Sequence, residues 1–157
     1  GVTAHAPVAA TVEAGVDVII IDHHLPGTEL PPALAVVNPN RLDDDSGLGY
    51  MAAAGVVFML VVALVRELRQ RDWFTANDRQ EPDLMAAIDL VALATVADVV
   101  PLAGLNRAFV RLGLKIMAKR GRVGLRVLAD IGRLNAPPDT EALGFVLGPR
   151  INAAGRF

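Results

Sequence analysis

The first third of the chain alternates short apolar runs with polar segments rich in Pro and Gly. Residues 16–21 read VDVIII, a β-branched run that begins after Gly15 and ends at a polar cluster. Because its hydrophobicity is nearly continuous, the run predicts a strand buried on both faces, as in a parallel sheet. Residues 35–38 predict a second short strand, closed by Pro39, and residues 7–14 predict a short helix before the first strand.

The rest of the chain carries longer apolar segments. Apolar patterns of ten or more residues are typical of helices rather than strands. Asn106 stands at the start of one such segment, where its side chain predicts an N-cap. Strands followed by helices place the chain in the α/β class. The predicted helices cover residues 52–71, 84–96, 106–119 and 124–131, with a connection at 73–82, a Pro-rich break at 135–139 and a short helix starting at 140–141.

The uncharged run at residues 51–65 raises the question of a membrane span. It has 15 residues before Arg66, whereas a spanning helix needs about 20 apolar residues. A buried core helix is the favoured interpretation, and we expect no membrane partner. Two short strands cannot cover the apolar face of such a helix. The pattern therefore predicts either further strands upstream or a chain that is a piece of a larger domain.

Composition narrows the possible classes of protein. The chain has 157 residues, no Cys, and 15 basic residues against 17 acidic ones. This length fits one domain. The lack of Cys excludes a disulfide scaffold and a thiolate zinc site, and it suits a reducing compartment. A protein that binds nucleic acid by bulk electrostatics shows a strong Lys/Arg excess. We therefore expect any nucleic-acid contact to be local, reinforced by a metal, or supplied by other parts of a larger protein.

The tripeptide Asp22-His23-His24 is the first candidate site, at the end of the first predicted strand. Open α/β sheets bind ligands outside the carboxyl ends of their strands. A carboxylate and two imidazoles there suit a divalent metal. Adjacent side chains point in different directions, so one His can ligate while the other meets substrate. The alternative is a structural Asp that caps the following loop, beside two ordinary polar His residues.

Asp98 is the second candidate, because it is a lone acid in an apolar stretch. An unpaired buried carboxylate is unfavourable, so it should pair with a cation or a metal. The alternative is a salt bridge to an arginine such as Arg107. The same reasoning applies equally to Asp89 in the preceding helix.

The third candidate is the segment at residues 150–156, which holds Arg150, Asn152 and Arg156. The guanidinium fork of Arg suits phosphate oxygens, and small neighbours let the backbone approach a ligand. The alternative is a loop with solvated Arg side chains. Residues 43–45, three successive Asp, indicate a solvated loop rather than a calcium site, since they lack the spacing of a calcium loop.

Taken together, five segments in order resemble the RecJ family of bacterial single-strand-specific DNA exonucleases, within the DHH phosphoesterase superfamily. The resemblance covers essentially the whole chain. The segments are VIIIDHH at 18–24, VNPN at 37–40, AAGVVF at 53–58, LVALATVADVVPL at 90–102 with Asn106 and Arg107 after it, and GPRINAAGR at 148–156.

The resemblance implies an α/β phosphoesterase domain with a mainly parallel sheet and two divalent ions, Mn²⁺ or Mg²⁺, at the strand ends. His23 and Asp98 resemble metal ligands, Asp22 an orienting catalytic carboxylate, and His24 the partner of the scissile phosphate. Further substrate-side residues implied by the resemblance are Asn106, Arg107, Arg150, Asn152 and Arg156.

The chain departs from the family pattern in one respect. The family also uses an Asp-x-Asp and an Asp-x-Gly motif upstream, and neither pair is present. We therefore expect residues 1–157 to be the latter part of a DHH catalytic domain, without its upstream strands and the downstream domains. Because the ligand set is incomplete, we expect the chain alone to be inactive and to bind manganese weakly.

The resemblance implies that the parent protein is a cytoplasmic hydrolase that degrades single-stranded DNA from 5′ to 3′ in repair and recombination. Its implied partners are single-stranded DNA, a single-strand-binding protein and a helicase. Two alternatives remain open. One is a phosphoesterase of the same superfamily that acts on oligoribonucleotides or cyclic dinucleotides. The other is a scaffold without catalysis, which would be expected to lose both the Asp-His-His and Asp98.

Overall fold

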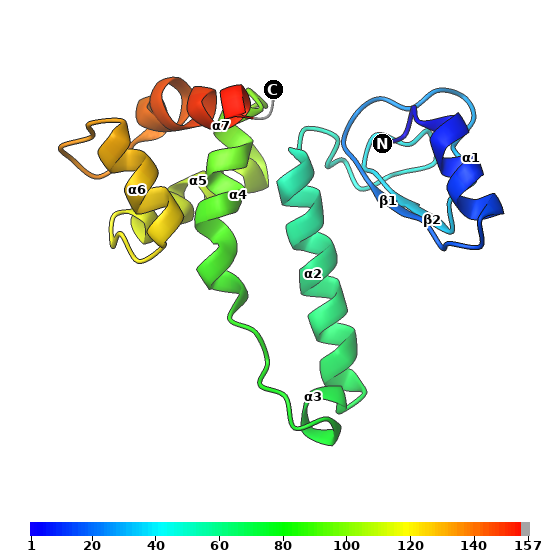
Figure 1. Ribbon diagram of the computed structural model, residues 1–157. Helices are drawn as coiled ribbons and strands as arrows, with labels where there is room; N and C mark the ends of the chain where they lie inside the picture. Colours follow the sequence, from blue (N-terminus) through cyan, green and yellow to red (C-terminus); the bar gives the residue numbers. More distant parts are fainter. Residues whose placement is uncertain (155–157) are drawn as a thin grey trace.

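The computed structural model describes residues 1–154, and it separates a small sheet-containing lobe from a helical lobe (Figure 1). The element η1 is a 3₁₀ helix and η2 is a π-helix. The elements in order are α1 (His5–Glu13), β1 (Ile19–Ile21), β2 (Ala35–Val37), α2 (Ala53–Gln70), α3 (Trp73–Ala76), η1 (Leu84–Ala87), α4 (Ile88–Ala97), α5 (Gly104–Met117), α6 (Val123–Ile131), η2 (Ala142–Leu147) and α7 (Gly148–Ala154).

The sheet lobe is built around two parallel strands, as predicted. Ile19, Ile20 and Ile21 pair with Ala35, Val36 and Val37 in that order. β1 is shorter than predicted, because residues 16–18 lie outside the paired stretch. It is also not buried on both faces as predicted, since Ile19 is 59% exposed. Helix α1 packs beside them, and a small apolar cluster forms the core of the lobe. Its buried members are Val2, Val8, Ile20 and Val36.

Helix α2 follows the sheet lobe and runs beside α4 (Figure 1). A second cluster, with Met51, Val56 and Phe109 among its members, joins the start of α2 to α4 and α5. The far side of α2 is not covered, since Met59 and Leu64 are exposed. This exposure agrees with the expectation that two strands are too few to cover the helix. Among the described residues, no helix combines the length and apolar character needed to cross a bilayer.

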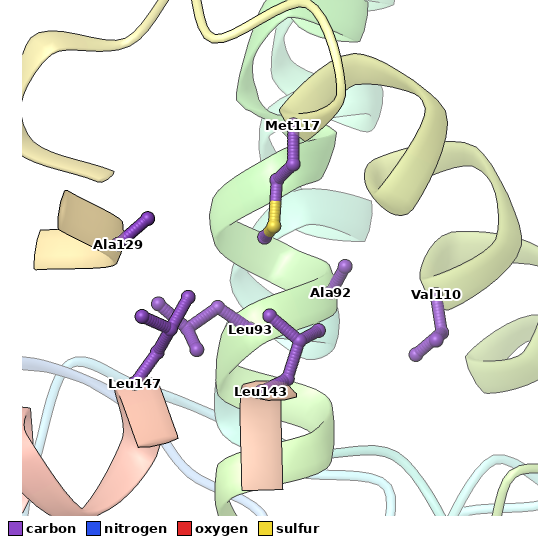
Figure 2. Packing of buried hydrophobic residues seen from close by; sticks show 7 residues of the cluster. All are labelled: Ala92, Leu93, Val110, Met117, Ala129, Leu143 and Leu147. Carbon is purple, nitrogen blue, oxygen red and sulfur yellow. The ribbon is translucent and has the colours of Figure 1, made fainter. Parts of the chain in front are cut away.

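The helical lobe holds the largest apolar cluster, which Figure 2 shows between α4, α5, α6 and η2. Gly113 of α5 lets the two helices α4 and α5 pack closely. A Cβ built at this position would lie 2.3 Å from the Cβ of Ala92 and 2.7 Å from the carbonyl oxygen of Ile88. The buried members of the cluster are Ala92, Leu93, Val110, Met117, Ala129, Leu143 and Leu147.

Two predictions about local structure are wrong, and the alternative of a loop at residues 150–156 does not hold for the part that is described. The connection predicted at 73–82 contains the short helix α3. Asn106 is not an N-cap, because α5 begins at Gly104 with Ala103 in the cap position. The amide of Asn106 instead bonds to two carbonyl groups outside the helix, which its place inside the first turn allows. The segment from Gly148, considered as a loop, forms the helix α7 through Ala154.

Candidate metal and catalytic site

The two lobes meet where His23 approaches Asp98. His23 follows the end of β1, whereas Asp98 is the C-cap residue of α4. The Nε2 atom of His23 lies 3.2 Å from Oδ2 of Asp98. The two residues that resemble metal ligands thus lie side by side. Asp98 is exposed rather than buried, and Arg107 is not its partner. A nitrogen and a carboxylate oxygen from separate lobes converge on one point.

The backbone after Asp98 is strained. Val99 adopts a φ of 58°, in the left-handed region that β-branched residues strongly avoid. The residue is 88% exposed, so packing of its side chain does not explain the conformation. A left-handed residue also follows the ends of α2, α3, α5 and α6, so this conformation is a way of ending a helix and not by itself a mark of the site. Here it turns the chain sharply just after the Asp98 carboxylate.

Asp22 is buried and receives hydrogen bonds on both carboxylate oxygens. Oδ2 accepts the backbone N–H of Val2 at 2.8 Å, and Oδ1 accepts those of His23 at 2.7 Å and His24 at 3.2 Å. Burial alone would raise the pKa of Asp22. The bonds from Val2, the His24 ring and the two His backbone groups together outweigh burial and hold this pKa well below its usual range. Asp22 is therefore an ionised carboxylate, and both of its oxygens already accept hydrogen bonds.

The Asp22 carboxylate orients the ring of His24. Its Nδ1 lies 2.6 Å from Oδ1 of Asp22, while the side chain is 72% exposed. When Nδ1 donates its proton to the carboxylate, Nε2 carries the free lone pair. The rings of His23 and His24 lie 4.4 Å apart between centroids. The two adjacent imidazoles therefore do different things: His23 faces Asp98, and His24 presents a free nitrogen to solvent.

Two asparagines that follow β2 complete the support, and the sequence analysis did not identify them. The Asn38 amide donates to the carbonyl of His24 at 2.8 Å, and the Asn40 amide donates to that of His23 at 2.6 Å. Asn40 also donates to the carbonyl of Gly49. Their position in the sequence could have identified them. Parallel strands end at the same edge of a sheet, and both asparagines follow the second predicted strand.

A cleft of about 460 Å³ opens beside His23 and Asp98. Its walls come from the start of α2, the face of α4 and the start of α7. Gly148 lets α7 approach α4, since a Cβ there would lie 3.1 Å from the Cβ of Ala97. Most of the wall is small or apolar, so the cleft has few polar groups. The remaining lining residues are Ala52, Ala53, Ala54, Leu90, Leu93, Ala94, Ala97, Ile151 and Asn152.

Asp89, which the sequence could not distinguish from Asp98, has a separate role. Its buried carboxylate accepts two hydrogen bonds from Arg122, at 2.7 and 2.9 Å. The same guanidinium donates to the carbonyl of Ala86. The hydrogen bond to Asp89 raises the pKa of Arg122. Asp89 is thus a structural partner that fastens α4 to the start of α6, away from the cleft.

The residues assigned to the substrate side are dispersed. Asn152 lines the cleft. Arg150 is exposed on α7 and donates to the carbonyl of Val146 at 2.7 Å. Arg107 is exposed on α5 and does not line the cleft. Arg156 lies outside the described residues.

Asn106 requires a correction. It is fully buried, and its amide donates to the carbonyls of Tyr50 at 2.8 Å and Pro101 at 2.9 Å. A buried side chain with both amide protons engaged in this way is not placed to contact substrate. Asn106 instead ties the loop after Asp98 to the segment that precedes α2.

The donor set fits a divalent ion that accepts nitrogen and oxygen ligands. Asp22, His23 and His24 offer ligand atoms that all lie within 4.8 Å of one another. Since both Asp22 oxygens hold N–H donors, the available groups are the imidazoles and the Asp98 carboxylate. Imidazole and carboxylate together suit Mn²⁺. The described residues offer too few carboxylates here to hold two ions.

Comparison with known proteins gives a consistent family match. The family model described as "DHH family, N-terminal domain" matches residues 1–95. The chain is 44% identical to the single-stranded-DNA-specific exonuclease RecJ of Dickeya dadantii and 46% identical to that of Salmonella typhimurium. Each match covers 100% of this chain and 28% of the relative. The chain therefore spans little more than a quarter of the length of these curated relatives.

Two solved structures are similar over nearly the whole chain. One is a crystal structure of exonuclease RecJ bound to manganese, with a TM-score of 0.76, 38% identity, and coverage of 99% of this chain and 36% of that chain. The other is RecJ from Thermus thermophilus in complex with Mn²⁺, with a TM-score of 0.75 and 38% identity, covering 99% of this chain and 22% of that chain. The likeness to these two structures supports the fold described above.

Proposed function

Because the chain belongs to the DHH family, we propose that it is part of the catalytic domain of a metal-dependent exonuclease that hydrolyses single-stranded DNA. The observation that carries the proposal is the His23–Asp98 pair at the wall of the cleft. The pair takes one ligand type from each lobe, and Asp22 holds the adjacent imidazole in place.

The proposed cofactor is Mn²⁺, with Mg²⁺ as the second choice, held by His23 Nε2 and the Asp98 carboxylate. Imidazole favours manganese over magnesium, which prefers oxygen ligands alone. The two solved structures described above are manganese complexes. When bound, the ion supplies the Lewis acidity that makes a water nucleophilic at neutral pH and offsets charge on phosphate oxygens.

The residues around the pair have separable roles in this proposal. Asp22 keeps its negative charge and fixes the Nδ1 proton of His24. The free Nε2 of His24 then points to the scissile phosphate. Asn152 contacts the substrate from the opposite wall of the cleft, and the alanines at 52–54 leave room for a nucleotide. Arg150 and Arg156 are assigned to phosphate contacts at the end of the domain.

We assign the parent enzyme to DNA repair and recombination in the cytoplasm, acting in the 5′ to 3′ direction. A single-strand-binding protein and a helicase are its proposed partners. A comparison of single-stranded DNA, oligoribonucleotides and cyclic dinucleotides as substrates tests the choice within the family. Preferential hydrolysis of either ribonucleotide class would contradict it.

The proposed roles of His23 and Asp98 are tested in the whole protein that carries this chain. We expect His23→Ala and Asp98→Ala to abolish hydrolysis while binding of single-stranded DNA is largely kept, because these residues serve the metal. Measurement of turnover and strand binding on the same samples checks this. His5→Ala and Asp45→Ala, at exposed positions outside the cleft, are the matched controls. Equal loss of binding and hydrolysis in both site variants would indicate a structural role.

The incomplete ligand set gives a second test, on residues 1–157 alone. We expect calorimetry to detect only weak Mn²⁺ binding, since an ion must exchange hydration for few protein ligands. Tight binding of two ions by this chain would show that its own residues complete the site.

A further inference from the structure

Charge is divided unevenly along the chain. Residues 104–133 hold eight basic side chains and one acidic side chain. Residues 1–103 hold five basic side chains and fourteen acidic ones. The near-zero net charge of the whole chain therefore conceals a strongly basic part, and this part corresponds to α5, α6 and their connection. If this chain contacts nucleic acid locally, as the overall charge balance requires, this basic part of the fold is the place for that contact.

Four of these cations form one row along the outside of α5. Arg107, Arg111 and Lys115 are spaced by four residues, so they lie on one face of the helix, over about 12 Å. Lys119 follows in the turn after the helix, and all four are exposed. We call these four residues the basic row. The opposite face of α5 is buried, through Asn106, Phe109, Val110, Gly113 and Met117.

In the described part of the chain, the side chains of the row are not paired, although Asp83 lines the same surface hollow as Lys115 and Lys119. Within residues 1–154, none of its four side chains forms an ion pair with a carboxylate, whereas Arg120 pairs with Asp130 and Arg122 with Asp89. Like charges four residues apart on a helix repel each other. Arg107 also stands in the first turn, where the helix dipole disfavours a cation. The arrangement is unfavourable for the isolated helix and becomes favourable when an anionic ligand with repeated charges lies along it.

The row is distinct from the cleft. Helix α4 presents Leu90, Ala94 and Ala97 to the cleft, whereas Ala92 on its other side packs against Gly113 of α5. Since the row faces away from α4, a nucleotide in the cleft does not reach it. The end of the row at Arg107 follows Asp98 by a short loop, however. The start of α5, where the row begins, is therefore within reach of a strand that leaves the cleft at the Asp98 end.

We propose that the basic row binds the phosphate backbone of single-stranded DNA outside the catalytic cleft. The proposal rests on the proposed function and extends it from the reacting nucleotides to the remainder of the strand. Cations spaced along a helix match a polyanion better than a compact anion. The exposed face of α5 carries no aromatic residue on which a base could stack. Binding there is consequently independent of sequence, and it holds long strands without affecting the chemical step.

The test uses the whole protein with the double substitution R111E/K115E. The matched control is R66E/R79E, which makes the same charge change at exposed positions away from α5. We expect R111E/K115E to weaken binding of a long single strand and to make the log–log salt dependence shallower by about 1.4, from two lost contacts of about 0.7 each. Hydrolysis of a trinucleotide should be unchanged. The new carboxylates lie four residues from Arg107 and Lys119, so the melting temperature should not fall.

The outcomes separate the row from the active site. If wild-type and variant proteins bind the long strand with equal affinity and equal salt slope, the row does not hold DNA, and an acidic protein segment becomes its candidate occupant. If trinucleotide hydrolysis falls as much as long-strand binding, the substitutions act through the catalytic cleft and the proposal is overturned. If the wild-type protein binds long strands through the row but does not hydrolyse them, the proposed exonuclease function fails while the row is upheld.

Discussion

The sheet lobe and the helical lobe are held together by different kinds of interaction. Four buried apolar residues form the core of the first, and seven form that of the second. The sheet lobe compensates with directed polar contacts, in which Asp22, Asn38 and Asn40 each bind backbone groups around the two histidines. The helical lobe depends on apolar packing, which is not directional and therefore tolerates small shifts of the side chains. The site combines the two: an accurately oriented imidazole from one lobe meets a carboxylate on a well-packed helix from the other.

The largest effect on stability is expected in the apolar core of the helical lobe. Leu143→Ala should lower the free energy of unfolding by about 2–5 kcal/mol, because the side chain is fully buried and its loss leaves a cavity. Urea unfolding of the whole protein measures this. Phe145→Ala, at a 79% exposed position of the same η2 segment, should change stability by less than about 0.5 kcal/mol. Equal effects of the two variants would contradict the described packing of η2.

The next effect concerns the polar network of the sheet lobe. Asp22→Asn should lower stability at neutral pH by about 1.5–3 kcal/mol, the range for hydrogen bonds to a charged group. In the folded protein the pKa of Asp22 is depressed. Its stabilisation is therefore present above the ordinary carboxyl pKa of about 3.9 and is lost as pH falls toward the lower folded value. Unfolding curves across this acid range should show the variant and wild type converging. Asp17→Asn, at an exposed position, is the control, and an Asp22→Asn penalty that grows in acid would contradict the assignment.

A smaller effect is expected from the amide that supports His23. Asn40→Asp keeps the shape of the side chain but removes the donor to the His23 carbonyl. Groups that orient a metal ligand affect metal affinity by about ten- to a hundredfold. We therefore expect Mn²⁺ binding to weaken by that factor in calorimetry on the whole protein. Asn77→Asp, which removes a similar amide-to-carbonyl bond beyond α2, should leave it unchanged. Unchanged affinity in Asn40→Asp would mean that the imidazole is held by its ring contacts alone.

The smallest effect on stability is expected at Val99, where a substitution should stabilise the protein instead of destabilising it. Val99→Gly should raise stability by roughly 0.5–1 kcal/mol, because a left-handed conformation is unfavourable for a residue with a Cβ. Turnover should fall, since the backbone next to Asp98 becomes freer. The same change in a helix, Val127→Gly, should lower stability by a similar amount. Thermal unfolding of both variants gives the comparison. A loss of stability in Val99→Gly would show that the valine is not strained.

The sequence predicted the elements whose hydrophobic pattern is local. The continuous run before Asp22 predicted the parallel strand, and the uncharged segment after Tyr50 predicted α2. The meeting of His23 and Asp98 could be expected only from the family resemblance, because 75 positions separate them in the sequence. Apart from that resemblance, nothing in the sequence distinguishes Asp98 from Asp89, since the partner of Asp89 lies on another element.

Other features depend on tertiary contacts that no local pattern contains. Asn106 looked like a cap because its identity favours that position, but the carbonyls of Tyr50 and Pro101 draw its amide into the interior. The basic row, in contrast, can be recognised from the sequence alone. Its spacing of four residues is visible in the sequence, but the overall charge of the chain concealed it.

The π-helical conformation of η2 has a consequence for insertions and deletions. A π turn holds one more residue than an α turn. Losing one residue from 144–146 can therefore be absorbed by converting this turn to an ordinary α turn, which leaves α7 in phase and Asn152 on the wall of the cleft. The same loss inside α7 would turn Asn152 by about 100° around the helix axis. Homologous chains of different length should accordingly differ within η2, and not in the residues between Gly148 and Asn152.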